Sequence, residues 1–345
     1  MKVVVTGATG NVGTSVVAAL ARDERVSEIV GIARRLPEWQ PPRTRWQSLD
    51  VARDDLDFDG AAAVIHLAWL IQPSRDAAEL ERVNVTGSRR VFDAAARAGA
   101  ALVHASSVGV YSPGPKDRAV DESWPRDGVP SLFYSRHKAA AERMLDERSE
   151  ELRIVRLRPG LIFKRESGPE IRRLFAGPLL PARLLGRLPV VPLPGGLSVQ
   201  CVHADDVGEA YRLAALDDTA RGAYNIAADP VLDADELAAL LGSGRRVGVP
   251  PNVLRALADL TYRAHLQPAP PGWLDMGMAV PVMDTTRARE QLGWTPRHSS
   301  YTALVALLDG MRAPAGAPTP PLEPRAGGRF RLGELRSGVG TRRDG

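Results

Sequence analysis

The first thirteen residues, MKVVVTGATGNVG, constrain the fold more tightly than any other stretch of the chain. Residues 3–5 are β-branched and apolar, which is typical of a buried parallel strand. Three glycines then follow at intervals of three, and residues 12–20 form an apolar stretch that is typical of a helix. The order of these segments predicts a strand that turns through glycines into a helix.

Such a turn presents backbone N–H groups and the positive end of a helix dipole to an anion. The alternative is a tight turn that binds nothing, but the flanking strand and helix favour a cradle for a dinucleotide pyrophosphate. The residues expected to form this cradle are Gly7, Thr9, Gly10, Asn11, Val12 and Gly13.

Strand patterns alternate with helix patterns through the first half of the chain. This alternation predicts an α/β fold, a doubly wound parallel sheet of the Rossmann type with helices on both faces. After the opening strand, the expected strands cover residues 28–32, 44–47, 61–68, 101–106 and 152–157, and the long helices cover residues 77–98 and 131–148.

The pattern changes after Pro159, where many prolines and glycines interrupt the sequence. Strands are expected again at 199–202 and 223–227, and helices at 205–216, 234–241, 252–265 and 300–312, so the second half is α-rich. We therefore expect a smaller substrate lobe over the carboxyl edge of the sheet, where doubly wound proteins bind ligands. The expected parts are a Rossmann domain at 1–163 with 198–229 returning to it, the substrate lobe at 164–197 and 230–310, and a disordered tail at 311–345.

The charge of the chain gives no indication of a nucleic-acid partner. The net charge is +4, but residues 311–345 alone hold seven arginines and three acidic residues, so the remaining residues are neutral overall. A single cysteine, Cys201, excludes an internal disulfide and fits a reducing compartment. Because no apolar run could span a bilayer and the first strand begins at residue 2, we expect a cytoplasmic protein without a membrane partner.

The end of the second strand usually distinguishes the two nicotinamide cofactors. An acidic residue there binds the ribose of NAD, whereas arginine accommodates the extra phosphate of NADP. Ala33 stands at that position and is followed by Arg34 and Arg35, which favours NADP over the alternative of two surface arginines. Asp50 and Val51 follow the third strand and are expected near the adenine.

Tyr134 and Lys138 are four residues apart on an expected helix and so share one face. An ammonium group beside a phenol stabilises the phenolate and lowers the pKa of the tyrosine, which then exchanges a proton with a substrate. Ser106 and Ser107 stand at the end of the fifth strand and offer the hydroxyl donor that such a site needs. A tyrosine–lysine spacing of this kind is common by chance, but its position after these serines makes it specific.

Three other groups are open to more than one interpretation. His203, Asp205 and Asp206 resemble a metal cluster, but no further ligands converge on them in the sequence. We therefore expect no metal, with Asp205 as the N-cap of a helix. His66 and His104 lie in apolar strands as core or cofactor-side residues, and residues 69–71 (Trp-Leu-Ile) fit a substrate wall and plain core equally well.

At this point the chain resembles the short-chain dehydrogenase/reductase superfamily, and more closely its extended branch, the NAD-dependent epimerase/dehydratase family. The resemblance covers about residues 1–300 and is specific because eight motifs occur in the family's order. They are TGATGNVG (6–13), VIHLA (64–68), NVTG (84–87), SSVGVY (106–111), YSRHK (134–138), RLRPGLIF (156–163), VHADDVGEAY (202–211) and LGWTP (292–296).

The resemblance implies a role for each matching residue. Ser107, four residues before Tyr111, would polarise a carbonyl group, Tyr134 would be the acid/base, and Lys138 would also hold the nicotinamide ribose. The glycines would bind the pyrophosphate, and Arg34 and Arg35 would meet the 2′-phosphate of NADP. The residues expected to line the cofactor from the fourth strand are His66, Leu67 and Ala68.

Departures from the family pattern bear on the reaction. Nucleotide-sugar members commonly carry an arginine–aspartate pair where this chain has Val199 and Gln200, and dehydratases add acids after the serine, where Val108 and Gly109 stand here. We therefore expect an NAD(P)-dependent oxidoreductase that transfers hydride at a carbonyl or alcohol carbon of a small molecule. The alternatives are a nucleotide-sugar epimerase or dehydratase, and a cofactor-binding regulatory protein without turnover. The resemblance also suggests a homodimer through residues 77–98 and 131–148.

Overall fold

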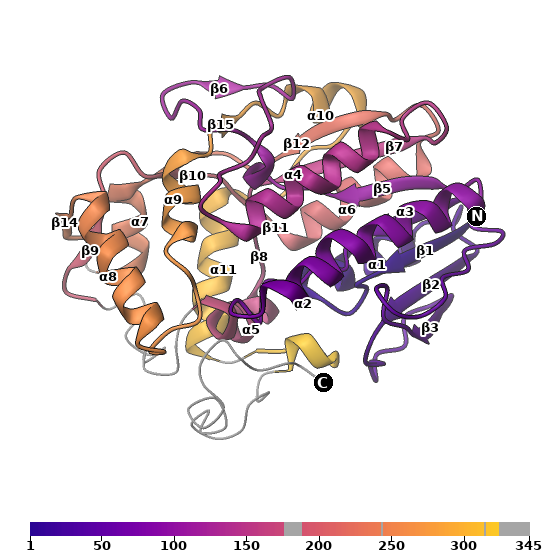
Figure 1. The fold of residues 1–345 in the computed structure, drawn as a ribbon, viewed down its shortest axis with the longest axis horizontal. Coiled ribbons are helices and arrows are strands. Elements are labelled where there is room, and N and C mark those ends of the chain that lie inside the picture. Colours follow the sequence, from indigo (N-terminus) through magenta and orange to yellow (C-terminus); the bar gives the residue numbers. More distant parts are fainter. Residues whose placement is uncertain (176–187, 243, 314, 324–345) are drawn as a thin grey trace.

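The computed structural model describes residues 1–175, 188–242, 244–313 and 315–323. Its centre is a seven-stranded sheet in the order β12-β7-β5-β4-β1-β2-β3, in which every neighbouring pair is parallel (Figure 1). The strands are β1 (Lys2–Thr6), β2 (Glu28–Ala33), β3 (Thr44–Ser48), β4 (Ala63–His66), β5 (Ala101–Ala105), β7 (Ile154–Pro159) and β12 (Gly222–Ile226). The prediction of a Rossmann-type parallel sheet is confirmed.

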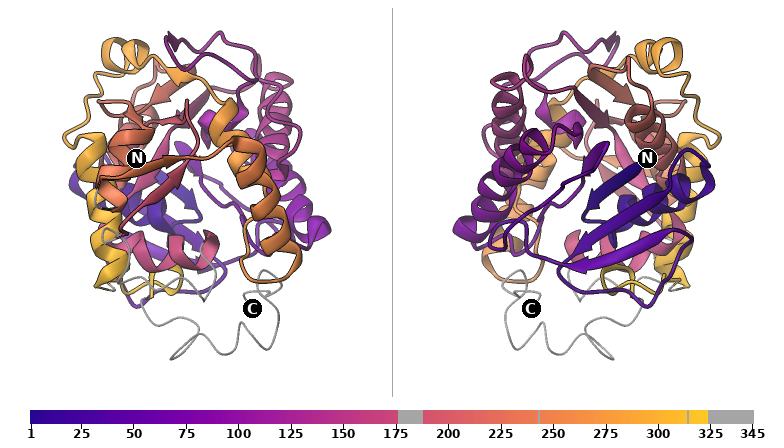
Figure 2. Two further views of the ribbon diagram at one scale, coloured as in Figure 1. Left: turned by 90° about the vertical axis from the view of Figure 1, so that its left-hand side faces the viewer. Right: turned by 90° about the vertical axis from the view of Figure 1, so that its right-hand side faces the viewer.

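Helices cover both faces of this sheet (Figure 2). On one face, α1 (Asn11–Arg22) and α6 (Ala204–Leu216) pack on the apolar side chains of Val3 and Val5. On the other face, α3 (Ser88–Arg97) and α4 (Phe133–Asp146) pack on Val4 and Val30. Successive residues of a strand point to opposite faces, so the three consecutive valines of β1 are buried on both sides of the sheet, as the sequence predicts.

The long helix expected at 77–98 is interrupted. It consists of α2 (Ala77–Glu81), a π-helical turn at Arg82–Gly87 and then α3. The turn carries Asn84, whose amide is bonded twice to the backbone of Leu70, accepting from its N–H at 2.7 Å and donating to its carbonyl at 2.8 Å. Short π-helical turns often occur at functional sites, and this one fixes the chain that leaves β4.

The smaller lobe is built from short elements that only the three-dimensional structure reveals. Four two-stranded pairs flank the main sheet: β8 (Leu161–Phe163) with β11 (Cys201–His203), β10 (Ser198–Val199) with β13 (Leu232–Asp233), β9 (Val191–Leu193) with β14 (Arg246–Gly248), and β6 (Ala119–Val120) with β15 (Val282–Met283). The helices are α5 (Gly168–Phe175), α7 (Ala234–Leu241), α8 (Pro251–Arg263), α9 (Gly272–Ala279), α10 (Thr286–Gln291) and α11 (Ser300–Arg312), with 3-10 turns at Val108–Val110, Arg165–Ser167 and Pro320–Leu322.

Apart from α10, which packs against the start of β12, these helices gather near the carboxyl ends of the parallel strands (Figure 1). The chain remains packed beyond residue 310, where the sequence places the start of a disordered tail. Residue 312 still belongs to α11, and Leu322 is fully buried, so the packed body continues to residue 323. The rest of the expected tail, residues 324–345, lies outside the described residues, as do residues 176–187 of the expected substrate lobe. None of the helices in the described ranges is both long and apolar enough to cross a membrane.

Candidate active site

The three glycines of the opening turn serve different purposes. Gly7 has a φ of +72°, and a Cβ atom there would lie 2.7 Å from the backbone nitrogen of Ala68. A Cβ atom on Gly13 would lie 2.6 Å from the carbonyl carbon of Ala8. Both glycines are therefore required by packing. A Cβ atom on Gly10 would meet nothing closer than the Gly7 carbonyl oxygen at 3.6 Å, which leaves this face of the turn open.

The N-terminus of α1 provides donors for that open face. Gly10 occupies the N-cap position and no side chain caps the helix, nor does its first turn carry an acidic residue. The Asn11 amide donates to Ile162 O at 3.1 Å, while its buried Oδ1 atom accepts no hydrogen bond from any described residue. Uncapped N–H groups beside an accessible glycine fit a bound pyrophosphate. Thr9 is buried in the same turn, and Val12 is half-buried.

The end of β4 forms the floor of this cradle. Leu67 and Ala68 are half-buried, and their backbone lies against Gly7. The His66 side chain instead points into the core, with Nδ1 2.7 Å from Thr6 Oγ1 and Nε2 2.9 Å from Ser88 Oγ. Burial lowers the pKa of His66 to about 3, so the ring is neutral and serves as a tie between elements.

The residues expected around the adenosine end fall into two groups. Arg34 and Arg35 are exposed after β2 and form no ion pair with any residue that the structure describes. Asp50 instead lies 3.5 Å from Arg82 and 3.8 Å from Arg53, and accepts a hydrogen bond from Ala52 N. Val51 is buried beside this group. The arginines are thus available to an anion.

Tyr134 and Ser107 meet at the carboxyl edge of the sheet. Tyr134 lies in the first turn of α4, and Ser107 precedes the 3-10 turn against which α4 packs. Burial raises the pKa of Tyr134, and a hydrogen bond with Ser107 opposes that increase. Ser106 is instead bonded to Glu142 at 2.5 Å, so the structure places Ser107, and not Ser106, beside the phenol.

Lys138 does not act on Tyr134 as the sequence predicts. Its ammonium group donates to Ala105 O at 2.6 Å and lies 3.4 Å from the ring centre of Trp69, against 5.7 Å from that of Tyr134. Burial also lowers the pKa of Lys138, with Glu142 opposing the change. The expected decrease in the pKa of Tyr134 is therefore wrong for this arrangement, because the charge is held by a carbonyl and an indole face.

A buried polar network that the sequence does not reveal supports these residues. Glu142 accepts two hydrogen bonds from Arg158, at 2.8 and 2.6 Å, in addition to the one from Ser106. Arg158 also donates to Tyr111 Oη at 3.0 Å, and that hydroxyl donates to Asn225 Oδ1 at 2.6 Å. One signal was available, because Tyr134, Lys138 and Glu142 recur every four residues along one helix face.

Aromatic side chains from the smaller lobe complete the site and were also missed. Trp273 of α9 lies 5.1 Å from Tyr134 between ring centres, and Phe175 of α5 lies 4.9 Å from Trp273. Trp69 lies 6.1 Å from Tyr134. Of the two interpretations left open for Trp69, the structure favours the wall of a site. Nothing in the local sequence around Trp273 marks it, because it reaches the site only through tertiary packing.

The remaining histidines do not form a metal centre. His203, and not the expected Asp205, is the N-cap residue of α6, since its Nδ1 accepts from Asp205 N at 3.2 Å. His203 stacks on His298 at 4.2 Å, and His298 Nδ1 lies 3.0 Å from Asp206 Oδ2. Among the described residues no three histidine, cysteine or acidic side chains come close enough to share a metal.

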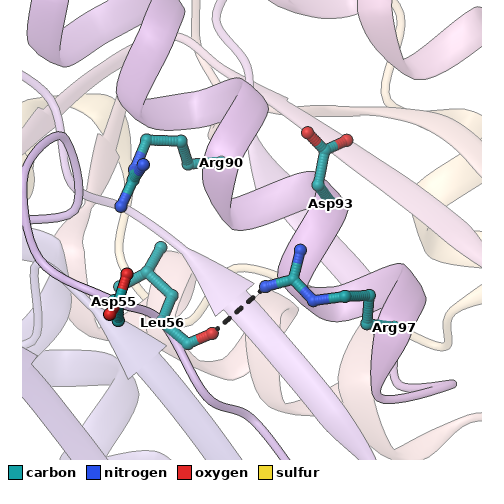
Figure 3. A pocket seen from close by; sticks show the side chains of 5 residues that line it. All are labelled: Asp55, Leu56, Arg90, Asp93 and Arg97. Atoms are coloured by element: carbon teal, nitrogen blue, oxygen red, sulfur yellow. Dashed lines mark hydrogen bonds between the residues drawn. The ribbon is translucent and has the colours of Figure 1, made fainter.

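A separate hollow of about 400 Å³ opens beside α3, as Figure 3 shows. Its two arginines are bonded to backbone carbonyls, Arg97 to Leu56 O at 3.3 Å and Arg90 to Val51 O at 3.2 Å. Its Asp93 is paired with Arg148 at 2.7 Å. Because its arginines and Asp93 are paired and none of Ser107, Tyr134 and Lys138 lines it, we place the chemistry at the sheet edge.

Comparisons with known proteins agree with this fold. An uncharacterized protein of Mycobacterium tuberculosis is 28% identical over 88% of this chain, although the chain spans only 29% of that relative's length. A 3-diazoavenalumate denitrifying reductase of a Streptomyces species is 29% identical, over 87% of this chain and 98% of the relative. In fold, the chain matches the UDP-glucose 4-epimerase of Thermus thermophilus in complex with NAD, with a TM-score of 0.65 at 20% identity over 91% of this chain and all of that one.

The sequence model of one family covers residues 3–227, which include the glycine turn, Ser107, Tyr134 and Lys138. The prediction of the family from its ordered motifs is confirmed. The chain belongs to the NAD dependent epimerase/dehydratase family.

Proposed function

We propose that this enzyme is an NAD(P)-dependent oxidoreductase that interconverts a carbonyl group and an alcohol. The observation that carries the proposal is that Ser107 and Tyr134 lie together around Gly109, at the same sheet edge as the open glycine turn. Ser107 would polarise the carbonyl oxygen, and Tyr134 would give it a proton. A reduced nicotinamide, when bound, supplies the hydride that brings two electrons to the carbonyl carbon.

Burial of Tyr134 suits this role. Because its pKa is raised, the phenol carries its proton at neutral pH and can donate it to a carbonyl that becomes an alcohol. Ser107 limits the increase in the pKa of Tyr134. The phenolate that remains after proton donation can therefore exist long enough to take a proton back. The buried network of Glu142 and Arg158 holds the strand end and the helix that carry these two hydroxyls.

The test is the Tyr134→Phe variant, which removes the hydroxyl and keeps the ring. We expect kcat for carbonyl reduction to fall by about 10²- to 10⁴-fold, with cofactor affinity unchanged. Nicotinamide absorbance measures turnover on a panel of carbonyl compounds, and cofactor fluorescence measures binding. Full turnover in this variant would remove Tyr134 from the mechanism, and a wild-type protein that binds cofactor but turns over nothing would indicate a regulatory role.

We infer that NADP is preferred over NAD. Arg34 and Arg35 directly follow β2, and both are exposed. Paired guanidinium groups bind a phosphate monoester in forked geometry. We expect Arg34→Ala to weaken NADPH binding about tenfold and to leave NADH binding unchanged, since only NADPH carries the 2′-phosphate. Arg45→Ala, on the neighbouring β3, is the control. Equal loss for both cofactors would contradict the inference.

A nucleotide-sugar epimerase remains the second candidate because the Thermus thermophilus enzyme shares this fold. The local structure counts against it, since the Gln200 amide is bonded to both backbone groups of Met283, at 2.7 and 3.0 Å, and Val199 is apolar. Epimerisation returns the cofactor to its starting state, so product analysis must accompany absorbance. We further propose a cytoplasmic homodimer that pairs through α3 and α4.

A further inference from the structure

The acid/base Tyr134 stands inside a run of aromatic rings. Trp69 lies on one side at 6.1 Å and 78°, and Trp273 on the other at 5.1 Å and 40°. Phe175 then meets Trp273 edge-on, at 4.9 Å and 81°. The four rings come from four separate segments: the loop after β4, α4, α9 and α5. Such convergence at one hydroxyl requires the tertiary fold.

These rings differ from the aromatic core of the protein. Trp294 and Phe92 are fully buried, as packing residues are, whereas the four rings at the site are all half-buried and keep accessible surface. Half-buried rings around a reactive hydroxyl are typical of a ligand site lined by aromatic groups. The rings therefore form a surface that a ligand can reach.

Tight packing fixes Trp273 relative to the chemistry. A Cβ atom on Gly109 would lie 2.9 Å from Met276 Sδ, 3.2 Å from Tyr134 Cε1 and 3.4 Å from Ser107 Oγ. Gly109 thus lets α9, which carries both Met276 and Trp273, approach the catalytic hydroxyls directly. A substrate that stacks on Trp273 would be positioned by the same helix that packs against Gly109 and Tyr134.

The charges around the rings do not suit a diphosphate. Lys116 donates to Ser198 O at 3.1 Å and to Gly277 O at 2.9 Å, and burial lowers its pKa to about 8. Arg255 is paired with Asp275 of α9 at 2.9 Å, and the Lys138 ammonium lies under Trp69. In the described part of the lobe, these cations beside α9 and Trp69 already interact with protein groups, so they are not free to bind a diphosphate.

We propose that the substrate of this enzyme is an aromatic carbonyl compound, or the corresponding aryl alcohol, which stacks on Trp273 and carries no phosphate. The proposal rests on the proposed function for the reacting group, but the stacking itself does not need turnover. The flat ring of the substrate occupies the aromatic surface, and its carbonyl oxygen meets Ser107 and Tyr134.

Binding tests this without catalysis. Acetophenone, cyclohexyl methyl ketone and UDP-glucose are titrated by calorimetry with NAD⁺ and NADP⁺ both present, because an oxidised cofactor cannot reduce a ketone. We expect acetophenone to bind more tightly than its saturated counterpart. We expect Trp273→Leu to weaken acetophenone binding about three- to tenfold and Trp273→Phe to retain it. The matched control is Trp39→Leu, because the Trp39 ring lies tilted against Trp46 at the far sheet edge.

Several results would overturn the proposal: equal binding of the two ketones, no binding of either, acetophenone affinity that is unchanged in Trp273→Leu, or tighter binding of UDP-glucose. The conservative Trp273→Phe variant guards against a leucine variant that simply unfolds. Different results would contradict the proposed oxidoreductase activity and the proposed aromatic substrate. Acetophenone binding without NADPH oxidation would contradict the oxidoreductase, whereas Tyr134-dependent oxidation of UDP-glucose alone, with formation of reduced cofactor, would contradict only the aromatic substrate.

Discussion

Tyr134 shows how the site balances opposing effects on one proton. Burial among aromatic rings disfavours the phenolate and raises the pKa, while the Ser107 hydroxyl stabilises the phenolate. Lys138, which could stabilise it further, is held by Ala105 O and by the face of Trp69. In this arrangement Ser107 is therefore the neighbour that keeps the phenol able to exchange its proton.

The burial of His104 makes the stability of the protein depend on pH. Its ring is fully buried between His66, Phe92 and Trp69, and neither ring nitrogen bonds to any described residue. Burial holds its pKa well below the ordinary value of 6.5. The folded state therefore keeps the ring neutral while the unfolded state binds a proton as the pH falls below about 6.5, so stability is lost toward acid.

We expect His104→Phe to be more stable than wild type, and increasingly so at acid pH. Between pH 6.5 and 5, a buried histidine that stays neutral lowers the free energy of unfolding by about 2 kcal/mol. The phenylalanine variant avoids this loss. Urea unfolding at pH 7.5 and pH 5 measures the difference. His265→Asn, at an exposed position with a φ of 57°, is the control and should not change the pH dependence. An unchanged acid loss in His104→Phe would show that the ring is protonated when folded.

At the level of single residues, the sequence predicted which side chains share a helix face better than it predicted which distant side chains they contact. The spacing of Tyr134 and Lys138 predicted that both lie on one helix face, and the order of the motifs predicted that Ser107 lies near Tyr134, where the structure has it. The spacing could not show that Trp69 covers Lys138, because the indole reaches it from a loop more than sixty residues away in sequence. Contacts of this range depend on the whole fold.

Helix α4 is the element that joins chemistry to the core. It carries Tyr134 and Lys138 toward the site and Glu142 one turn further along, where Arg158 and Ser106 bind the carboxylate. The bidentate guanidinium lowers the pKa of Glu142, against the effect of burial, so the carboxylate stays ionised beneath the site. The same pair fixes α4 against β7.

We expect Glu142→Gln to destabilise the protein by about 3–5 kcal/mol, because it leaves the guanidinium of Arg158 buried without its counter-charge. Chemical denaturation measures the loss. Glu147→Gln, at the exposed end of the same helix, should change stability by less than about 0.5 kcal/mol. The double variant Glu142→Gln/Arg158→Met removes both charges and should recover part of the loss. No recovery would show that the carboxylate acts through Ser106 rather than through Arg158.

Elements with a strong repeating pattern were predictable, and short ones were not. The helix expected at 234–241 is present with the same bounds, and that at 300–312 likewise. The π-helical turn at Arg82–Gly87 and the two- and three-residue strands of the smaller lobe have no period long enough to detect. They form because distant partners are present, such as Leu70 for Asn84.

At the scale of the whole molecule, the alternation of strands and helices was enough to predict the parallel sheet, because parallel neighbours need a crossover connection, which is usually a helix. The arrangement of the smaller lobe was not predictable in this way. Its helices α5 and α9 bring Phe175 and Trp273 to Tyr134 through packing that leaves no local signal. The substrate side of the site therefore had to come from the structure.

Cofactor binding should stabilise the whole molecule through the glycine turn, and two alanine variants separate binding from folding. A ligand at 100 times its Kd adds about 2.7 kcal/mol to the stability of the folded state. Gly10→Ala has room for its methyl group, so we expect a Tm close to wild type without cofactor. The methyl group occupies the face left open for a pyrophosphate, so we expect the increase in Tm with NADP or NAD to be lost.

Gly13→Ala should behave in the opposite way, because its methyl group would overlap the backbone of Ala8 whether or not a ligand is present. We expect its Tm without cofactor to fall well below that of wild type. Differential scanning calorimetry with and without each cofactor measures both variants. A full cofactor-induced increase in Gly10→Ala would mean that the pyrophosphate does not approach this face of the turn, and the phosphate-binding role of the whole N-terminal segment would have to be reassigned.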